Sequence, residues 1–491
     1  MVVNSLIKYT LLAFYCIASS SLNAQNQDVW VNQDVSSDAF KSDMSLLWKV
    51  LNENHSGLFN YSDSLEFASY LEEYQQINDS LKMHEAFYEL AGLVNLIKDG
   101  HTYIMPNDHQ DEALLSSVGF LPFTFKIIKN SLLIDQNFGG ARFEKGMEVI
   151  AIDGMKTEDL LGVLREYMTT DGCSPEPKND MLEGQLWWYY GLHFGFKERH
   201  HLVYLDKYGR RNAAFVGAVS FYDRHRMLEE GLGREEEALL SYKLIGDAAY
   251  LRVTRFWGWS ARRYGKTLDE AFDFFAQNKC RELIIDIRGN GGGREGFENR
   301  LLSHLNHSLE EKYDRVLMKR VFASEYSHLE KGFVKRFEDL LYRAIEFRKT
   351  QDGFWERRNR FQSSWKQKTA PFEGLSYVLI DGEVFSGAAE FSSMAKDYGV
   401  KCVLVGEETG GGYQGNTSGY FYTLELPNTG FVVKIPRILF DLAVKDNSWQ
   451  GGVMPDIIIS DKVEDYIKGE DTQLNFVLSL IQNGYVLSPE K

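Results

Sequence analysis

A serine at the start of a predicted helix is the residue best placed for covalent chemistry. Ser386 follows the apolar, strand-like run 377–380 and precedes Gly387, Ala388 and Ala389. The positive end of a helix dipole favours a developing alkoxide at this position, and small neighbours leave room for a substrate carbonyl. Serine is also a preferred helix N-cap, so position alone does not separate a nucleophile from a cap.

His101 is the candidate base for this serine. It follows Asp99 and Gly100, where a predicted amphipathic helix ends, and it precedes a short strand-like run. Histidine titrates near neutral pH, so its ring is suited to take the proton of a hydroxyl group. His55 is the alternative base. No His-Glu-x-x-His or comparable spacing of ligands occurs, which disfavours a metallopeptidase.

A glycine-rich turn after the strand-like run 283–287 offers a set of backbone N–H groups. Glycines let these groups point into a concavity without obstruction by side chains. The turn lacks a following Lys-Ser/Thr and a full dinucleotide fingerprint, so a phosphate site is disfavoured. A purely structural turn is the alternative. We expect the N–H groups of Gly387 and of Gly292 or Gly293 to form an oxyanion hole.

Five short segments resemble one enzyme family when they are taken together. The resemblance is to the C-terminal processing, or tail-specific, serine peptidase family. It covers about residues 36–460 and implies a crotonase-like α/β core, usually with a PDZ-like domain, and peptide-bond hydrolysis through an acyl-enzyme. The segments are Asp-Gly-His-Thr (99–102), Asp-Ile-Arg-Gly-Asn-Gly-Gly-Gly (286–293), Val-Phe-Ser-Gly-Ala-Ala-Glu (384–390), Gly-Glu-Glu-Thr-Gly-Gly-Gly (406–412) and Gly-Val-Met-Pro-Asp (452–456).

The family resemblance also implies which group activates the serine. One branch uses a lysine at about the position of Gly412, and no lysine stands there. The tricorn-like branch uses a histidine upstream of the PDZ-like region, and His101 matches that position. That branch has a glutamate just before the Gly-Val-x-Pro-Asp segment, where this sequence has Gln450. Gln450 is therefore an expected orienting group for the imidazole, with Glu408 or Glu407 as alternatives.

The elements that must position these residues indicate an α/β protein of several domains. The 491 residues are 44% hydrophobic, enough for a sizeable core and two or three domains. From about residue 242, apolar strands alternate with helices, which predicts a largely parallel sheet. Upstream, a strand that ends in Ile152-Asp153-Gly154 and leads into a helix resembles half of a PDZ domain. We predict a crotonase-like core of parallel strands and helices, an N-terminal helical segment and a PDZ-like β-rich domain.

The predicted domains include a cleaved leader. Lys8 precedes the apolar run 9–18, which is too short to span a bilayer, and Leu22-Asn23-Ala24 supplies a cleavage site. A buried helix or an uncleaved anchor is the alternative. The predicted domains are a signal peptide (1–24), an N-terminal helical segment carrying His101 (25–114), a PDZ-like domain (115–215), a tail-specific protease core (216–465) with a helical insertion at about 300–370, and a C-terminal helix (466–491).

Charge and cysteine content exclude several classes of function. The net charge of −16 and the lack of a dense Lys/Arg stripe disfavour a nucleic-acid partner. The cysteines are too few and too widely spaced for a disulfide scaffold or a zinc site. No metal or organic cofactor is implied. We expect an exported serine endopeptidase, periplasmic or extracellular, without a membrane span in its mature form and with a polypeptide substrate. The oligomeric state stays open.

Two other functions remain open from the sequence. A catalytically weak or inactive homologue would bind peptides or small apolar ligands without cleaving them. A crotonase-like thioester enzyme would use a similar oxyanion turn without a Ser–His pair.

Overall fold

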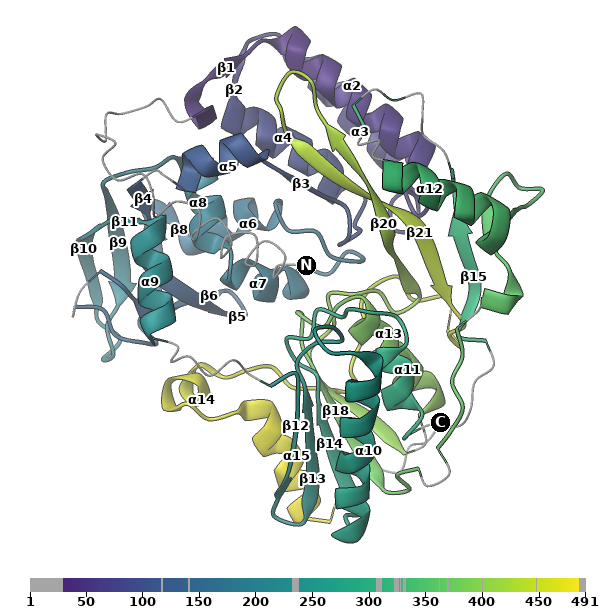
Figure 1. Ribbon diagram of the computed structural model, residues 1–491. Helices are drawn as coiled ribbons and strands as arrows, with labels where there is room; N and C mark the ends of the chain where they lie inside the picture. Colours follow the sequence, from purple (N-terminus) through teal and green to yellow (C-terminus); the bar gives the residue numbers. More distant parts are fainter. Residues whose placement is uncertain are drawn as a thin grey trace, which may run out of the picture.

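The computed structural model describes most of the chain and arranges it in lobes around a shared centre (Figure 1). The predicted signal peptide lies outside the described residues. Within the described residues, no helix combines the length and the apolar character needed to cross a membrane. The described residues are 30–484 except for 116–117, 140–141, 232–237, 306–310, 322–325, 327, 330–332, 362, 369–370, 400 and 447.

A six-stranded sheet forms the core of the C-terminal half. Neighbouring strands from β13 to β22 are parallel, and only β12 pairs antiparallel with β13. Because the parallel strands are apolar runs, both faces of the sheet can be covered, and the predicted α/β core is confirmed. The strand order is β12 (Leu240–Ile245), β13 (Ala248–Val253), β14 (Glu282–Asp286), β18 (Leu375–Ile380), β19 (Cys402–Gly406) and β22 (Ile457–Ile458).

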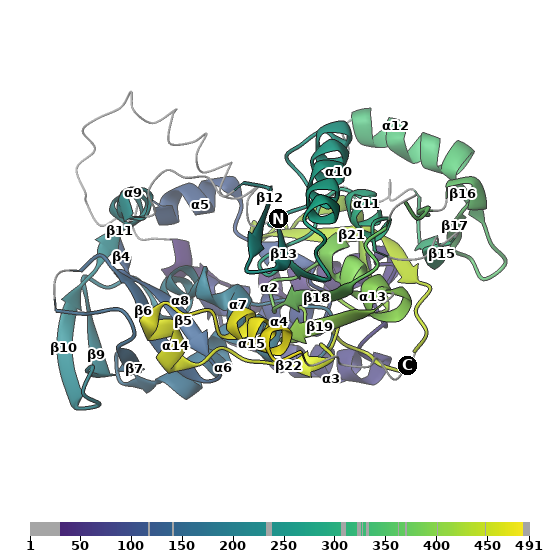
Figure 2. The same cartoon turned by 90° about the horizontal axis from the view of Figure 1, so that it is seen from below.

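Helices cover the two faces of this sheet. Alternate strand residues turn toward one face, where α10 (Ala261–Gln277), α11 (Phe297–Leu302) and α13 (Gly387–Tyr398) share a core with them. The other residues pack against α15 (Thr472–Gln482), which follows the short α14 (Val463–Lys468) along the opposite face (Figure 2). Both faces of the central strands are therefore buried.

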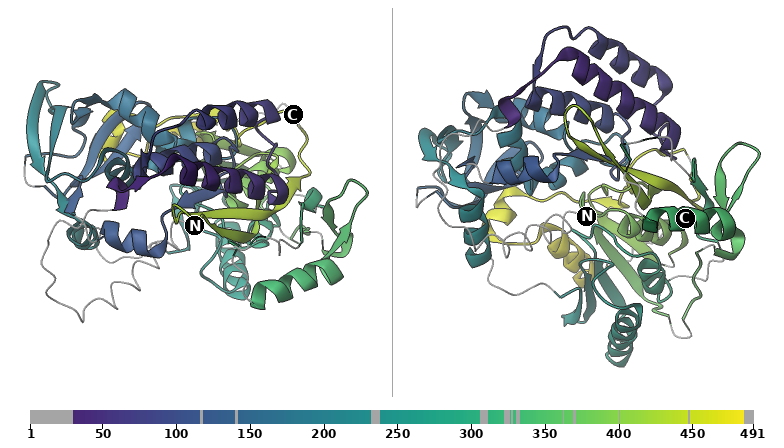
Figure 3. Two further views of the ribbon diagram at one scale, coloured as in Figure 1. Left: turned by 90° about the horizontal axis from the view of Figure 1, so that it is seen from above. Right: turned by 45° about the horizontal axis from the view of Figure 1, so that its top comes forward.

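A second β-structure links the core to the N-terminal helices. The antiparallel pair β20 (Gly415–Glu425) and β21 (Val432–Leu442) packs under α2 (Ser37–Asn54), and Figure 3 shows that helix lying over the pair. β3 (Tyr103–Met105) adds to β21 antiparallel. This pairing attaches the segment after His101 to the core. The layer is completed by α3 (Ser64–Gln75), α4 (Met83–Asn95), β15 (Tyr313–Met318), β16 (Phe347–Lys349) and β17 (Trp355–Arg357).

The segment at about 300–370 differs from the helical insertion that we expected. Its described part contains one helix longer than two turns, α12 (Phe333–Leu341), together with the strands β15, β16 and β17. β15 joins the sheet through β21. The strands are short, and short apolar runs do not distinguish strand from helix by periodicity. The edge of an existing sheet decides their conformation instead.

The β-rich region upstream of the core is an antiparallel sheet with helices beside it. It occupies the left of Figure 1, and its strands run in the order β10, β9, β7, β6 and β5. The PDZ-like assignment of this region stays a prediction. The strands are β5 (Phe123–Ile128), β6 (Ser131–Asn137), β7 (Glu148–Ile152), β9 (Arg199–Leu205) and β10 (Arg211–Gly217), and the helices include α6 (Thr157–Arg165), α7 (Glu176–Glu183) and α8 (Leu186–Phe194).

Candidate active site

Ser386 stands on a strained turn between β18 and α13. Its backbone has φ 53° and ψ −129°, a region that residues with a side chain rarely adopt. The glycine-rich turn after β14 crosses directly behind it, and a Cβ added at Gly292 would lie 2.8 Å from the Ser386 Cβ. Phe385 donates its N–H to the carbonyl of Asn290 at 3.1 Å. The contacts between the two turns therefore hold Ser386 in an unfavourable backbone conformation.

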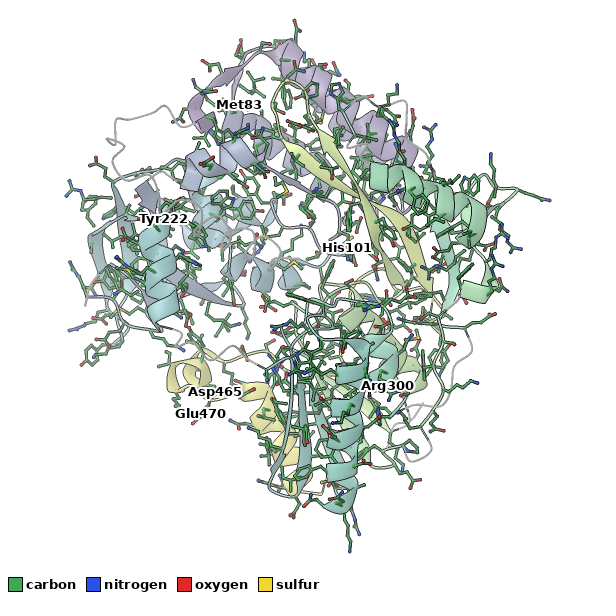
Figure 4. The ribbon with its side chains drawn as sticks, in the orientation of Figure 1. Met83, His101, Tyr222, Arg300, Asp465 and Glu470 are labelled. Carbon is green, nitrogen blue, oxygen red and sulfur yellow. The ribbon has the colours of Figure 1, made fainter. Side chains whose placement is uncertain are left out.

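His101 lies beside this serine, although 285 residues separate the two in the chain. The distance from His101 Nε2 to Ser386 Oγ is 3.2 Å. The imidazole is 3% exposed, and its ring centroid lies 4.6 Å from that of Phe385. Figure 4 shows His101 at the centre of the molecule, between the β-rich lobe and β20. The geometry therefore allows a proton to pass between the two side chains.

Burial keeps the imidazole of His101 neutral. Desolvation lowers its pKa to about 4, while the nearby carboxylates of Asp99 and Glu390 offset part of that effect. A neutral imidazole can accept a proton at Nε2 over the whole physiological range of pH. Its other nitrogen, Nδ1, is buried and has no hydrogen-bond partner among the described residues.

The carboxylate of Asp99 lies between two histidines. His55 Nε2 is 2.7 Å from Asp99 Oδ2, and the hydroxyl of Thr417 donates to the same oxygen at 2.5 Å. The Gly57 N–H donates to His55 Nδ1 at 3.2 Å, which places the proton of a neutral His55 on Nε2. Burial alone would raise the pKa of Asp99, but the hydrogen bond from His55 and the two imidazoles hold it below its usual range. Asp99 is therefore charged at neutral pH.

Asp171 completes this buried group. One oxygen of Asp99, one of Asp171 and a ring nitrogen of His101 all lie within 4.8 Å of one another. The Asp171 carboxyl accepts the N–H groups of Gly100 at 2.9 Å and Gly412 at 3.0 Å. Burial, and then the charge of Asp99, raise the pKa of Asp171 well above its usual range. Asp171 is therefore a neutral acid that can donate to Asp99.

The spacing within this group would also suit a cation, but its oxygens already have other partners. Asp99 Oδ2 accepts bonds from His55 and from two threonine hydroxyls, and both oxygens of Asp171 accept backbone N–H groups. A proton shared by the two carboxyls satisfies the same atoms without a further ligand.

The backbone N–H groups of Gly293 and Gly387 belong to residues that lie close together beside Ser386. A Cβ added at Gly387 would lie 3.8 Å from the Gly293 nitrogen, so these two residues face each other. Neither N–H has a hydrogen-bond partner within the described part of the chain. The Gly292 N–H is different, because it donates to Asn290 Oδ1 at 2.9 Å. Of the expected oxyanion donors, Gly387 and Gly293 are available and Gly292 is not.

Gln450, the expected orienting group, does not contact the His101 imidazole in the structure. The Gln450 side chain is exposed, and no hydrogen bond between it and His101 occurs among the described residues. The Glu408 carboxylate accepts the Gly452 N–H at 2.9 Å and the hydroxyl of Ser174. In the sequence, Asp99 stands out only as part of the Asp-Gly-His-Thr motif. Asp171 carried no signal, since its partners are far away in the chain.

Comparison with known protein families finds a match to part of the chain. Residues 247–459 match the profile of Peptidase family S41. The matched segment contains the glycine-rich turn and Ser386. The match supports a serine peptidase, as the five segments suggested. No curated protein sequence matches the chain.

Solved structures share the fold of the chain. A mutant of CPAF superposes with a TM-score of 0.62 at 15% identity, covering 91% of this chain and 98% of that one. Mature CPAF gives a TM-score of 0.61 at 14% identity, covering 92% and 99%. Mature CPAF complexed with lactacystin gives a TM-score of 0.59 at 14% identity, covering 91% and 99%. At these identities the likeness shows a shared fold alone.

The strain at Ser386 predicts an unusual order of stabilities. A residue in such a backbone conformation costs about 1–3 kcal/mol. Ser386→Gly relieves this cost, whereas Ser386→Ala retains it. Glycine also lowers the free energy of unfolding by about 0.5–1 kcal/mol relative to alanine, because it makes the unfolded chain more flexible. We expect Ser386→Gly to unfold in urea with a free energy about 1 kcal/mol above that of Ser386→Ala. A Ser386→Gly variant that is less stable than Ser386→Ala by about 0.5–1 kcal/mol would show that the turn is not strained.

Proposed function

We propose that the protein is a serine endopeptidase that cleaves exported polypeptides through an acyl-enzyme. The observation that supports this most is the 3.2 Å approach of His101 Nε2 to Ser386 Oγ, next to two unpaired N–H groups. A serine nucleophile needs a base within hydrogen-bond reach and donors aimed at the developing oxyanion. Both requirements meet at Ser386.

The chemistry follows from the positions of these groups. Ser386 Oγ attacks the scissile carbonyl while its proton moves to His101 Nε2. The carbonyl oxygen becomes an oxyanion that accepts bonds from the N–H groups of Gly293 and Gly387. The imidazolium then gives its proton to the leaving amine, and the C–N bond breaks. A water molecule, deprotonated by His101, hydrolyses the ester and restores Ser386.

Asp99 is the positioning residue that we propose for His101. When Nε2 receives the serine proton, a positive charge forms on an imidazole that is 3% exposed. A charge formed in such a site needs an opposite charge nearby. Asp99 is charged, lies in the same buried group and raises the pKa of His101. Gln450 is neutral and exposed, so Asp99 suits this role better.

Export is proposed from the leader over residues 1–24. A basic residue, a short apolar run and a small-residue cleavage site support secretion to the periplasm or the medium. We expect exported protein to begin at Gln25 on N-terminal sequencing. An intact Met1 in exported material would contradict it.

Substitutions at the site test its chemistry. We expect Ser386→Ala to abolish cleavage of a disordered polypeptide and labelling by a fluorophosphonate. We expect Asp99→Asn to lower kcat by about 10²–10⁴-fold with little change in KM, because a neutral amide does not stabilise the imidazolium. Gln450→Ala is the matched control, with an expected change below about threefold. Circular dichroism checks the fold of each variant.

Two outcomes would contradict the proposal. If wild type and Ser386→Ala show the same activity on every polypeptide, a binding protein is favoured over a peptidase. If Asp99→Asn is as active as Gln450→Ala, Asp99 has no role in the mechanism.

The pH profile should reflect the buried state of His101. The logarithm of kcat/KM reports the free enzyme, and its acid limb should show a pKa of about 4 rather than 6.5. Below this value His101 binds a proton and no longer acts as a base. Rates are measured with a disordered peptide between pH 3.5 and 8. An acid limb centred between 6 and 7 would contradict a buried base.

Stability must be followed in parallel, because the same histidine destabilises the fold in acid. The unfolded imidazole has a pKa near 6.5, while the folded one has about 4. The unfolded state therefore binds more protons between these values, and stability present above pH 6.5 is lost as pH falls. His193 and His304, with pKa values also lowered to about 4 by burial, act in the same direction. Tryptophan fluorescence at each pH separates loss of fold from loss of base.

A further inference from the structure

A cavity opens next to the glycine-rich turn of the proposed active site. Its volume is about 540 Å³, and it is bounded by α10, the turn 294–296 and α11. Arg294 lines it and follows Gly293 directly, and the Gly293 N–H faces Gly387. Consecutive Cα atoms are about 3.8 Å apart, so the wall of the cavity begins one residue from the proposed oxyanion hole.

The cavity is basic in a protein that is acidic overall. Four of its lining residues are cationic and two are acidic, whereas the chain has 54 Lys and Arg against 70 Asp and Glu. Both acids already have cationic partners. Asp269 pairs with Arg300 of the cavity itself at 2.7 Å and with Lys368 at 2.8 Å, and Glu295 lies 3.4 Å from Arg357. The cations are Arg262, Lys266, Arg294 and Arg300.

Two of these arginines have no anionic partner. The guanidinium groups of Arg262 and Arg294 make no hydrogen bond or ion pair within the described residues. Arg262 also stands in the first turn of α10, where the helix dipole disfavours cations and no acidic residue offsets it. A cation in this unfavourable position, with no acidic residue to offset it, is typical of a functional site.

Buried polar atoms at the base of the cavity also lack partners. Tyr264 stacks on Phe297 with ring centroids 4.5 Å apart, and its buried hydroxyl has no hydrogen bond among the described residues. The same holds for Nε of Arg300, whose label in Figure 4 lies beside α10. A Cβ added at Gly265 would lie 3.2 Å from that nitrogen. The glycine, costly within a helix, gives the guanidinium its room.

We propose that this cavity binds a carboxylate of the polypeptide substrate within a few residues of the scissile bond. Planar guanidinium groups bind carboxylates in a bidentate manner, and Arg262 and Arg294 can supply them at the rim. The Tyr264 hydroxyl and Arg300 supply further donors. The carboxylate can come from an Asp or Glu side chain or from the C-terminus of the substrate. The inference rests on the proposed peptidase function, because it assigns a substrate preference to the same site.

The test uses a set of disordered ten-residue peptides. Each carries one Glu or one Gln at a given position, and every position is scanned. Each peptide is made with a free or an amidated C-terminus. Wild type should cleave at least one Glu peptide with a kcat/KM about tenfold above that of its Gln partner. A preference abolished by amidation, without a Glu effect, would assign the carboxylate to the C-terminus.

Variants connect the preference to the cavity. We expect the double variant Arg262→Gln, Arg294→Gln to reduce the ratio of kcat/KM between paired peptides to about one. Arg263→Gln is the matched control: it removes one charge from the same helical turn, but its guanidinium lies 4.1 Å from the Trp259 ring centroid. Its ratio should stay at the wild-type value. Cleavage without preference at every position, or a preference that the double variant retains, would overturn the proposal.

Binding distinguishes failure of this inference from failure of the peptidase function. The same peptides are titrated into Ser386→Ala protein by calorimetry. If wild type cleaves nothing while Ser386→Ala prefers the carboxylate peptides, and the two arginine substitutions abolish that preference, the cavity assignment stands and the peptidase function fails. Equal binding of charged and neutral peptides would overturn the cavity assignment.

Discussion

The crossing of two turns at the ends of neighbouring parallel strands is the constraint on which the site depends. β14 and β18 lie side by side in the same direction, so their C-terminal ends open at one edge of the sheet. The turn after β14 supplies Gly293, and the turn after β18 supplies Ser386. They can approach because Gly292 has no side chain, and the bond from Phe385 to the Asn290 carbonyl fixes their register. The proposed nucleophile and the proposed oxyanion donors are thereby one rigid unit.

Buried charges hold α13, the helix that begins directly after Ser386. Glu390, one turn into α13, accepts Lys312 at 2.5 Å and Asn416 at 2.8 Å. Lys312 is fully buried and also lies 2.7 Å from Glu298 on α11. The Lys312 ammonium therefore joins α11 to α13, and the Glu390 carboxylate joins α13 to β20. Separating it from either carboxylate would leave an unpaired charge in the interior, at a cost of about 3–5 kcal/mol. Burial lowers the pKa of His101, and the same Glu390 carboxylate offsets part of that effect, so this group both anchors α13 and acts on the proposed base.

The sequence allowed the α/β core to be predicted and singled out His101 and Ser386, whose side chains lie 3.2 Å apart in the structure, because the core strands and these two positions follow local patterns. Apolar runs ending in glycine turns mark β14 and β18, and Ser386 follows one of them. The sequence could not show whether Gly292 or Gly293 has the free N–H group. Successive N–H groups in a turn point in different directions, so a shift of one residue changes which of them is free. Gln450 was expected from its position before a shared segment. Position along a loop does not fix the direction of a side chain.

Asp171 could not be predicted from the sequence, because the groups that it contacts are far away in the chain. Its contacts show how His101, the proposed base, is held. His101 belongs to the N-terminal segment, while Ser386 belongs to the core. Asp171 receives the Gly100 N–H from the first and the Gly412 N–H from the second, and its own N–H donates to Gly410 at 2.9 Å. Burial, and then the charge of the neighbouring Asp99, raise the pKa of its carboxyl well above the usual range, which favours the neutral form. One protonated carboxyl therefore links the backbone that carries the base to the backbone beside the nucleophile, and it leaves the negative charge on Asp99, where the imidazolium needs it.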